Sequence, residues 1–138
     1  MTSPLAVLER TFRPIDPPLR PVTGCRDCGV VLAGVYLLVK RDEIVYIGST
    51  ADILRRLYAH VSDRRRRQRF SKRFDRVLWL ELPAAVIAHY EGALVRALRP
   101  PGNSVVHVRK FDAHDAEILY GLGLRDELAI DEIAWEAA

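Results

Sequence analysis

The middle of the chain carries a dense run of basic side chains, RRRRQRFSKRFDR, at residues 64–76. Eight of these 13 residues are lysine or arginine, and such runs attract phosphate backbones because binding releases counterions. The alternative is a solvated surface that only keeps the protein soluble. We expect the run, together with the preceding Arg55, to bind nucleic acid. The expected contacts are Arg55, Arg64, Arg65, Arg66, Arg67, Arg69, Lys72 and Arg73.

One carboxylate occupies a position where an apolar side chain is expected. Ile87, Glu91, Leu94 and Leu98 recur at helical spacing and therefore share one face of a helix. An unpaired carboxylate among core residues is costly, so this placement suits a glutamate that meets a metal ion or a basic partner. The alternative is a glutamate at the edge of the stripe, with its carboxylate in water.

Two similar phrases hold one tyrosine each, Gly-Val-Tyr at residues 34–36 and Tyr-Ile-Gly at residues 46–48. Both lie in stretches rich in valine, isoleucine and tyrosine, which is typical of β-strands. A hairpin loop of three residues, 40–42, would place Tyr36 directly across from Tyr46. Both phenols would then project from one face of the sheet, and each phrase carries a glycine on its outer side.

The elements that must position these residues follow from turn signals and periodicity. A helix is expected over residues 49–63, with Ser49 or Thr50 as its cap. On one face of this helix Arg56 and His60 are four residues apart and therefore neighbours. The remaining elements are strands at 34–40, 43–48 and 76–82, and a second helix from Pro83 to about Leu98.

Charge divides the chain into parts of opposite sign. Residues 34–110 carry 16 basic and 7 acidic side chains, whereas residues 111–138 carry 1 and 8. We expect a Pro-rich, extended leader over 1–29, a regular domain over 30–110 and an acidic helical tail over 111–138. The tail is expected either to pack on the domain or to lie near the basic residues of 34–110 and compete with nucleic acid. It is also the expected contact for a second copy of the chain or for a protein partner.

Two further features concern metal binding and location. Cys25 and Cys28 form a CxxC pair, which is half of a zinc site, and a reduced pair without metal is the other interpretation.

The longest apolar run, Val30 to Val39, is far shorter than the ~20 residues of a membrane helix, and no signal peptide is evident at the N-terminus. We therefore expect a cytoplasmic protein.

Taken in order, these motifs resemble those of the GIY-YIG nuclease superfamily. After the two tyrosine phrases, GSTADILRRLYAH is similar to the first-helix motif of the family, and EGALVRALRPPGN is similar to its metal-binding helix. On this resemblance Arg56, Glu91 and Asn103 match the family's arginine, metal ligand and asparagine. His60 matches the histidine of the homing-endonuclease branch. The first phrase departs from the family name only in Val35, which stands where the name has isoleucine.

The resemblance covers roughly residues 33–103. It implies an α+β fold in the wider α/β class, with a small three-stranded antiparallel sheet flanked by helices, here with extra C-terminal helices. It also implies an endonuclease that depends on a divalent metal, with one Mg²⁺ or Mn²⁺ held by Glu91. Gly34 and Gly48 would let the backbone approach closely where the site is built.

The resemblance further implies a division of catalytic roles. Arg56 would brace the phosphate. Asn103, which matches the family's asparagine, is also expected to be a catalytic residue. A phenol would take the proton of the attacking water, and Tyr36 is favoured, with Tyr46 beside it. An ordinary phenol with a pKa near ~10 is a poor base at neutral pH, so nearby positive charge is expected to lower the pKa. His60 would relay that proton.

The expected substrate is DNA, whether single-stranded, duplex or branched. We expect weakly sequence-specific or structure-directed cleavage, because the sequence shows no second DNA-reading domain. Two other functions are considered: a non-catalytic nucleic-acid-binding module that kept the fold, and an accessory subunit of a larger DNA-processing complex. Loss of Glu91, Arg56 or a tyrosine would favour the first of these, and none is lost.

Overall fold

The computed structural model describes residues 3–18, 32–65, 74–103 and 111–124 of the 138-residue chain, and only the backbone of 62–65. Within these ranges no helix is long and apolar enough to cross a membrane. In chain order the elements are α1 (Pro4–Leu8), β1 (Arg13–Pro14), β2 (Gly34–Lys40), β3 (Glu43–Thr50), α2 (Ile53–Arg65), β4 (Arg76–Glu81), α3 (Ile87–Leu98) and α4 (Ala113–Gly121).

The strands form one antiparallel sheet in the order β1-β4-β2-β3. The predicted α+β class with an antiparallel sheet is confirmed, but the sheet has four strands rather than three. The additional strand is β1, in which Arg13 pairs with Trp79 and Pro14 pairs with Leu78. Proline has no N–H to donate, and it is tolerated here because β1 lies at the edge of the sheet.

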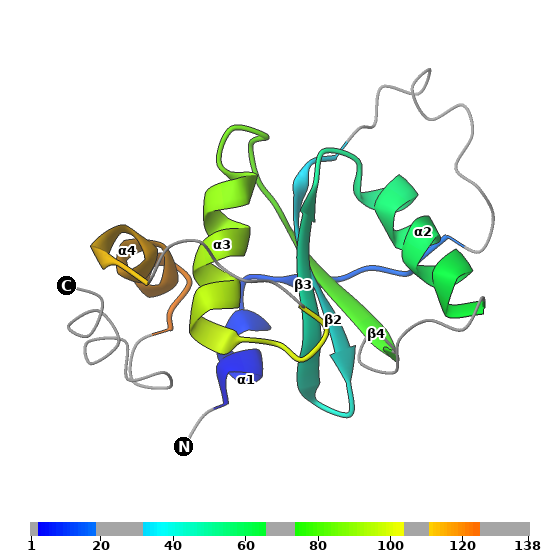
Figure 1. Cartoon of the computed structure of the whole chain (residues 1–138), viewed down its shortest axis with the longest axis horizontal. Coiled ribbons are helices and arrows are strands. Elements are labelled where there is room, and N and C mark those ends of the chain that lie inside the picture. The colour runs from blue at the N-terminus through cyan, green and yellow to red at the C-terminus, as the bar shows by residue number, and fades with distance from the viewer. Residues whose placement is uncertain (1–2, 19–31, 66–73, 104–110, 125–138) are drawn as a thin grey trace.

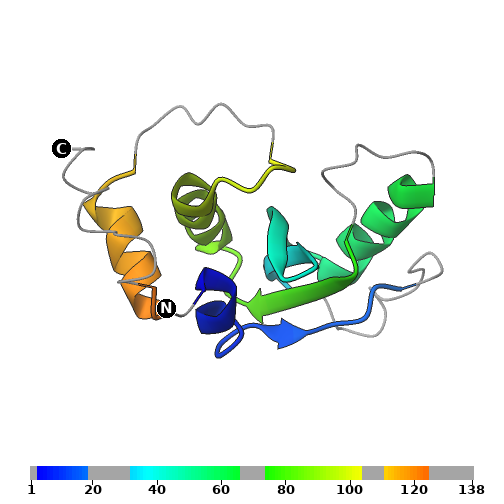
Figure 2. The ribbon, with the colours of Figure 1, turned by 90° about the horizontal axis from the view of Figure 1, so that it is seen from below.

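The sheet separates two groups of helices, with α2 on one face and α1, α3 and α4 on the other (Figure 1). The view from below shows the same division (Figure 2). Alternate residues of the central strand β2 therefore enter different cores. Val35, Leu37 and Val39 pack on the α3 side, while Tyr36 and Leu38 pack on the α2 side. Because both faces are covered, β2 is buried along its length up to its last residue.

A turn of two residues joins β2 to β3, so the expected loop of three residues is wrong. Arg41 and Asp42 both have positive φ, 49° and 63°. A two-residue turn with positive φ at both positions matches the right-handed twist of the strands that it joins.

The pairing of β2 with β3 also differs from the prediction. Tyr36 lies across from Gly48 and Tyr46 lies across from Leu38, so the two tyrosines do not face each other directly. The shorter turn displaces the pairing by one residue, and a bulge next to Leu38 displaces it by one more. Because side chains alternate between faces, a displacement of two residues leaves both phenols on the same face, as predicted.

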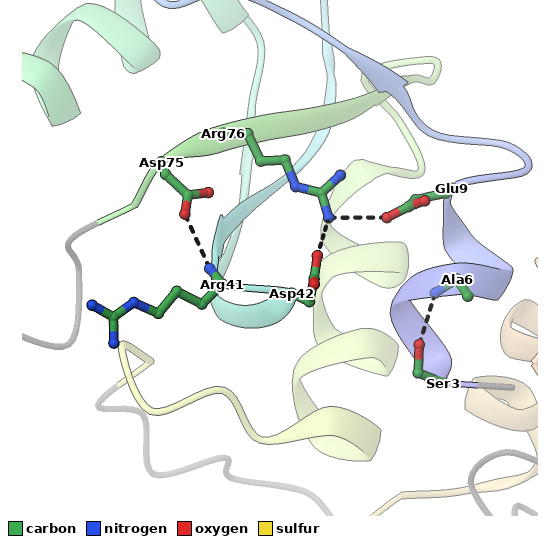
Figure 3. Close-up of polar contacts among 7 residues, drawn as sticks. All are labelled: Ser3, Ala6, Glu9, Arg41, Asp42, Asp75 and Arg76. Carbon is green, nitrogen blue, oxygen red and sulfur yellow. Dashed lines mark hydrogen bonds and ion pairs between the residues drawn. The ribbon is translucent and has the colours of Figure 1, made fainter. Parts of the chain in front are cut away.

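Side chains around the turn connect it to the N-terminal helix (Figure 3). One guanidinium nitrogen of Arg76 lies 3.1 Å from carboxylate oxygens of both Glu9, which follows α1, and Asp42 in the turn. The backbone N–H of Arg41 donates to the carboxylate of Asp75 at 3.0 Å. These side chains are largely exposed, so each ion pair contributes at most about 1 kcal/mol.

Residues 3–14 are folded onto the domain, whereas the leader was expected to be extended. The Ser3 hydroxyl accepts a hydrogen bond from the Ala6 N–H at 3.2 Å, and Pro4 takes the first helical position. Serine followed by proline is a helix-start signal, and it outweighs the extended preference of the prolines further on. The buried apolar residues of this segment are Leu5, Val7, Leu8 and Phe12.

Asp52 caps α2, rather than Ser49 or Thr50. The Asp52 carboxylate accepts from the Arg55 N–H at 3.3 Å, and the helix begins at Ile53. Ser49 and Thr50 instead extend β3 beyond its predicted end. This extension keeps the Ser49 side chain in the sheet, where its contacts matter for the site.

α3 also begins later than predicted, at Ile87 rather than at Pro83. The chain first makes a turn in which the Val86 N–H donates to the Pro83 carbonyl at 3.0 Å. The helix ends at Leu98 as predicted, because Arg99 adopts a left-handed conformation with φ 47°.

α4 belongs to the same core as α3. Its segment buries six apolar side chains against the rest of the domain: Phe111, Ala116, Ile118, Leu119, Leu122 and Leu124. Of the two roles considered for the acidic tail, packing on the domain is therefore the one that residues 111–124 fulfil. Residues 125–138 lie outside the described part of the chain.

Candidate active site

A buried phenol oxygen is the centre of the cluster on the α2 side of the sheet. The Tyr36 side chain projects from β2 toward α2 and is fully buried. Its oxygen lies 2.8 Å from Nε2 of His60, and it accepts a hydrogen bond from Nε of Arg56 at 3.2 Å. Because Arg56 and His60 are four residues apart on one helix, both reach the same oxygen.

Tyr46 completes this group of rings. Its ring centroid lies 6.1 Å from that of Tyr36 and 5.2 Å from that of His60. The rings of Tyr36 and His60 lie 5.5 Å apart and meet edge to face. Tyr46 is half-buried, whereas Tyr36 and His60 are buried. The four residues predicted for this side of the site are therefore assembled together.

Each of the two glycines in the tyrosine phrases leaves space for a different neighbouring group. A Cβ on Gly48 would collide with the hydroxyl and ring of Tyr36, because the phenol crosses directly over its pairing partner. A Cβ on Gly34 would collide with the backbone carbonyl of Leu80 on β4. Gly48 thus makes room for the candidate catalytic phenol, and Gly34 makes room for the neighbouring strand.

Replacing Gly48 by alanine is expected to displace the Tyr36 ring and to lower the free energy of unfolding by about 1–3 kcal/mol, the usual cost of overpacking a core. Urea denaturation measures the change. Gly121→Ala is the matched control, because a Cβ there meets nothing within 4 Å. If the two variants are equally stable, the ring is not confined by Gly48.

Glu91 lies on the other side of the sheet, on α3, where it is half-buried. Its Oε2 accepts a hydrogen bond of 2.7 Å from the hydroxyl of Ser49 on β3. Sequence reasoning missed this contact because Ser49 was considered only as a helix cap. The alternation of side chains along β3 was the available signal, since Ser49 must face away from Tyr46 and Gly48.

The candidate residues therefore form two groups that meet along β3. The phenols, Arg56 and His60 are on the α2 face, and Glu91 with Ser49 is on the α3 face. Gly48 and Ser49 are consecutive, so one step along the strand separates the two groups. Since β3 is an edge strand, a ligand at this point of the strand can reach side chains of both faces.

Asn103 pairs with the free edge of β3. Its Oδ1 accepts from the Ile47 N–H at 2.9 Å, and its Nδ2 donates to the Ile47 carbonyl at 2.8 Å. The neighbouring Gly102 N–H donates to the Val45 carbonyl at 2.7 Å. The amide side chain thus replaces the peptide group of a further strand and holds β3 in place between the two groups of candidate residues. Its predicted catalytic role stays a prediction.

A family comparison gives the relationship of this chain to known proteins. The family model described as the GIY-YIG catalytic domain matches residues 32–100. The chain belongs to the GIY-YIG family. Neither the comparison with curated proteins nor the comparison with solved structures found a match. The resemblance predicted from the order of the motifs is confirmed.

GIY-YIG domains are generally endonucleases that depend on a divalent metal, and a nuclease domain implies a DNA substrate. The matched span contains both tyrosines, Arg56, His60 and Glu91, and it ends three residues before Asn103. The individual roles of these residues stay predictions.

The protonation of Tyr36 bears on its predicted role as a base. Its pKa is raised above the ordinary value, chiefly because burial disfavours the phenolate, and the adjacent Tyr46 phenol adds to this effect. The hydrogen bond and charge of Arg56 act in the opposite direction but do not outweigh burial. The expectation that nearby positive charge lowers the pKa of the phenol is therefore wrong for Tyr36 in this GIY-YIG domain, and Tyr36 is a neutral phenol at neutral pH.

This raised pKa predicts a loss of stability in alkali. In the unfolded chain Tyr36 ionises near its ordinary pKa of ~10, whereas in the folded protein it keeps its proton to higher pH. Above about pH 10 the unfolded state binds fewer protons, so stability falls as pH rises, by up to about 1.4 kcal/mol per pH unit for one proton. The free energy of unfolding is measured with urea from about pH 9 to about pH 11. It should fall less steeply with pH for Tyr36→Phe than for the wild type, whereas the control Tyr58→Phe should follow the wild type. Equal slopes in all three proteins would contradict the prediction.

One divalent cation fits the donor set at Glu91. Within the described ranges, no group of three or more His, Cys, Asp or Glu side chains could enclose a metal ion. Mg²⁺ often binds through one or two carboxylates and completes its coordination with water and substrate phosphate. A half-buried carboxylate whose Oε2 is already held by Ser49 is suited to that mode. The identity of the ion, Mg²⁺ or Mn²⁺, stays a prediction.

The predicted nucleic-acid contacts are placed only in part. The Nε of Arg55 lies 3.8 Å from Oδ2 of Asp52. The Arg55 side chain is nevertheless exposed, so it is accessible to a phosphate. The other predicted contacts, Arg64, Arg65, Arg66, Arg67, Arg69, Lys72 and Arg73, have side chains outside the described part of the chain, and so do Cys25 and Cys28.

Proposed function

We propose that this chain is a divalent-metal-dependent endonuclease that hydrolyses DNA phosphodiester bonds. The observation that carries the proposal is the Tyr36 oxygen, which is held by Arg56 Nε on one side and His60 Nε2 on the other. Arg56 itself remains exposed, so a phosphate can reach its guanidinium. A buried phenol that joins an accessible arginine to a histidine is suited to proton transfer next to a bound phosphate.

The raised pKa of Tyr36 favours a relay over a free phenolate. As the phenol oxygen takes a proton from the attacking water, its own proton can pass to Nε2 of His60 over the 2.8 Å hydrogen bond. Tyr36 then stays neutral overall, so the buried site never holds a full phenolate charge. The Arg56 hydrogen bond stabilises the partial negative charge on the phenol oxygen during transfer. The resemblance led us to expect Tyr36 as the base and His60 as the relay. This assignment instead makes Tyr36 the relay and His60 the final acceptor.

Glu91 would hold one Mg²⁺ or Mn²⁺, which when bound would supply positive charge to the phosphate and to the leaving oxygen. Because Glu91 and the phenols approach β3 from opposite faces, the scissile phosphate would lie across the strand near Gly48 and Ser49. The absence of a side chain at Gly48 lets the Tyr36 phenol lie directly against this stretch of the strand. Asn103 would act from the outer edge by fixing the position of β3.

We further propose that cleavage is weakly sequence-specific or directed by DNA structure. Support comes from the basic middle of the chain, since phosphate contacts raise affinity without reading sequence. Cytoplasmic location and a contact of residues 111–138 with a second copy or a protein partner are kept as proposals.

The test uses the purified full-length chain with Mg²⁺ or Mn²⁺ on matched single-stranded, duplex, flap and junction DNAs. We expect cleavage of at least one DNA form, abolished by chelation, and little cleavage of an RNA control of the same sequence. Tight binding of every DNA without cleavage under any of these conditions would instead support a non-catalytic nucleic-acid-binding module.

A further inference from the structure

Ser49 donates a hydrogen bond to the carboxylate that the proposed function assigns to the metal. The Ser49 Oγ and the Glu91 Oε2 lie 2.7 Å apart, although the residues are 42 positions apart in the sequence. This distance is the usual one for a hydrogen bond that a hydroxyl donates to an oxygen. The contact joins β3 to α3 at the point where the two groups of candidate residues meet.

Both ends of this hydrogen bond are fixed by the core. Ser49 pairs with Val35 on the central strand, and Val35 is fully buried. On α3 the residues one turn after Glu91, Leu94 and Val95, are buried in the same core. With both backbones fixed, the hydroxyl limits the rotation of a long, half-exposed glutamate side chain that would otherwise sample several rotamers.

The residue types at these two positions are not explained by packing alone. A β-branched apolar residue at position 49 would suit a half-buried strand better than serine does. A leucine in place of Glu91 would continue the apolar stripe of α3 toward the core. A hydrogen bond at the margin of a core adds little net stability, because both groups would otherwise bond to water, so stability gives little reason for this polar pair.

We propose that Ser49 is a positioning residue that holds Oε2 of Glu91 and thereby presents Oε1 to a divalent cation. In the described part of the chain Oε2 is the oxygen that is hydrogen-bonded, which leaves Oε1 for the ion. Such outer hydrogen bonds orient metal-binding carboxylates, and their loss typically weakens metal binding or activity by about 10–100-fold. The inference rests on the proposed function, in which Glu91 is the metal ligand.

The test measures metal binding without DNA. Mn²⁺ binding to the full-length chain is followed by electron paramagnetic resonance for the wild type, Ser49→Ala and Ser49→Thr, with Glu91→Gln to define unspecific binding. We expect Ser49→Ala to bind Mn²⁺ about tenfold more weakly. Ser49→Thr keeps the hydroxyl and should restore affinity to within about threefold of the wild type. Thermal unfolding of each variant checks that the fold is retained.

A second measurement separates positioning from a general loss of activity. In DNA cleavage, Ser49→Ala should raise the Mg²⁺ concentration for half-maximal rate by about tenfold and largely recover the rate at saturating Mg²⁺. Equal Mn²⁺ affinity of the wild type and Ser49→Ala, or equal weakening in Ser49→Ala and Ser49→Thr, would overturn the role of the hydroxyl. Wild-type protein that binds no more Mn²⁺ than Glu91→Gln would overturn the assignment of Glu91, which is the distinct failure of the proposed function.

Discussion

Replacing Glu91 by glutamine is expected to reduce metal-dependent DNA cleavage by about 10³-fold while DNA affinity stays close to that of the wild type. Glutamine keeps the size of the side chain and can still accept from the Ser49 hydroxyl, but it lacks the charge that a hard divalent cation requires. A bound cation contributes several kcal/mol to stabilising the transition state, and each ~1.4 kcal/mol corresponds to a tenfold change in rate.

Single-turnover cleavage at saturating enzyme measures the rate, and fluorescence anisotropy without metal measures affinity. Glu117→Gln is the matched control, because it also removes one negative charge but lies exposed on α4, away from β3. The control should cleave at the wild-type rate. Wild-type cleavage by Glu91→Gln, still abolished by chelation, would show that the ion is held elsewhere.

Replacing Asp115 by alanine is expected to lower the free energy of unfolding by about 3–5 kcal/mol, the typical cost of removing one partner of a buried ion pair. Asp115 is fully buried on α4, and both of its carboxylate oxygens lie 2.7 Å from guanidinium nitrogens of Arg96 on α3. Its loss would leave the Arg96 charge buried without this partner. The same carboxylate accepts from the Asp112 N–H at 3.1 Å, so the capping box of α4 would be lost too.

Urea denaturation at neutral pH measures this change, and a loss of this size is a large fraction of the usual total stability of a domain. Glu117→Ala, at an exposed position of the same helix, is the control and should change stability by less than about 0.5 kcal/mol. Replacing both partners with apolar residues, Arg96→Met with Asp115→Leu, should recover much of the loss. If Asp115→Ala is as stable as Glu117→Ala, the ion pair does not fix α4 on α3.

The position of α4 also changes how the acidic tail must be tested. A chain truncated after Lys110 would lack Asp115 and the buried Leu119 and Leu124, so it is not expected to keep the fold. A truncation after Leu124 keeps the whole of α4. That shorter truncation is the one that can separate competition with DNA from loss of the core.

Local periodicity was enough to predict much of the fold and the grouping on α2. The bounds of β2 match the prediction, since alternating and apolar residues between turn signals define a strand. Arg56 and His60 are neighbours because a helix returns to the same face after four residues. Tyr36 and Tyr46 share the predicted face because the shorter turn and the bulge together displace the pairing by two residues. These relations depend only on the geometry of one element or of one hairpin.

The order of the motifs along the chain was also sufficient to predict the family, and the family comparison confirms it. The sequence likewise singled out Glu91 as a carboxylate on an otherwise apolar stripe. The sequence therefore supported a set of candidate site residues on separate elements. It contained no information on which face of the sheet each element would cover.

Tertiary structure decided the remaining features, because they depend on contacts between distant residues. The bulge in β3 set the pairing of Tyr36 with Gly48, and the phenol then required a residue without a side chain there. The hydrogen bond from Ser49 to Glu91 spans 42 residues, and the ion pair from Arg96 to Asp115 spans 19. Such contacts form only once α3 packs on the sheet and α4 packs on α3. The sequence by itself therefore determined which groups are present and which neighbours share a face, while packing across the sheet decided that the phenols and the carboxylate approach one edge strand from opposite sides.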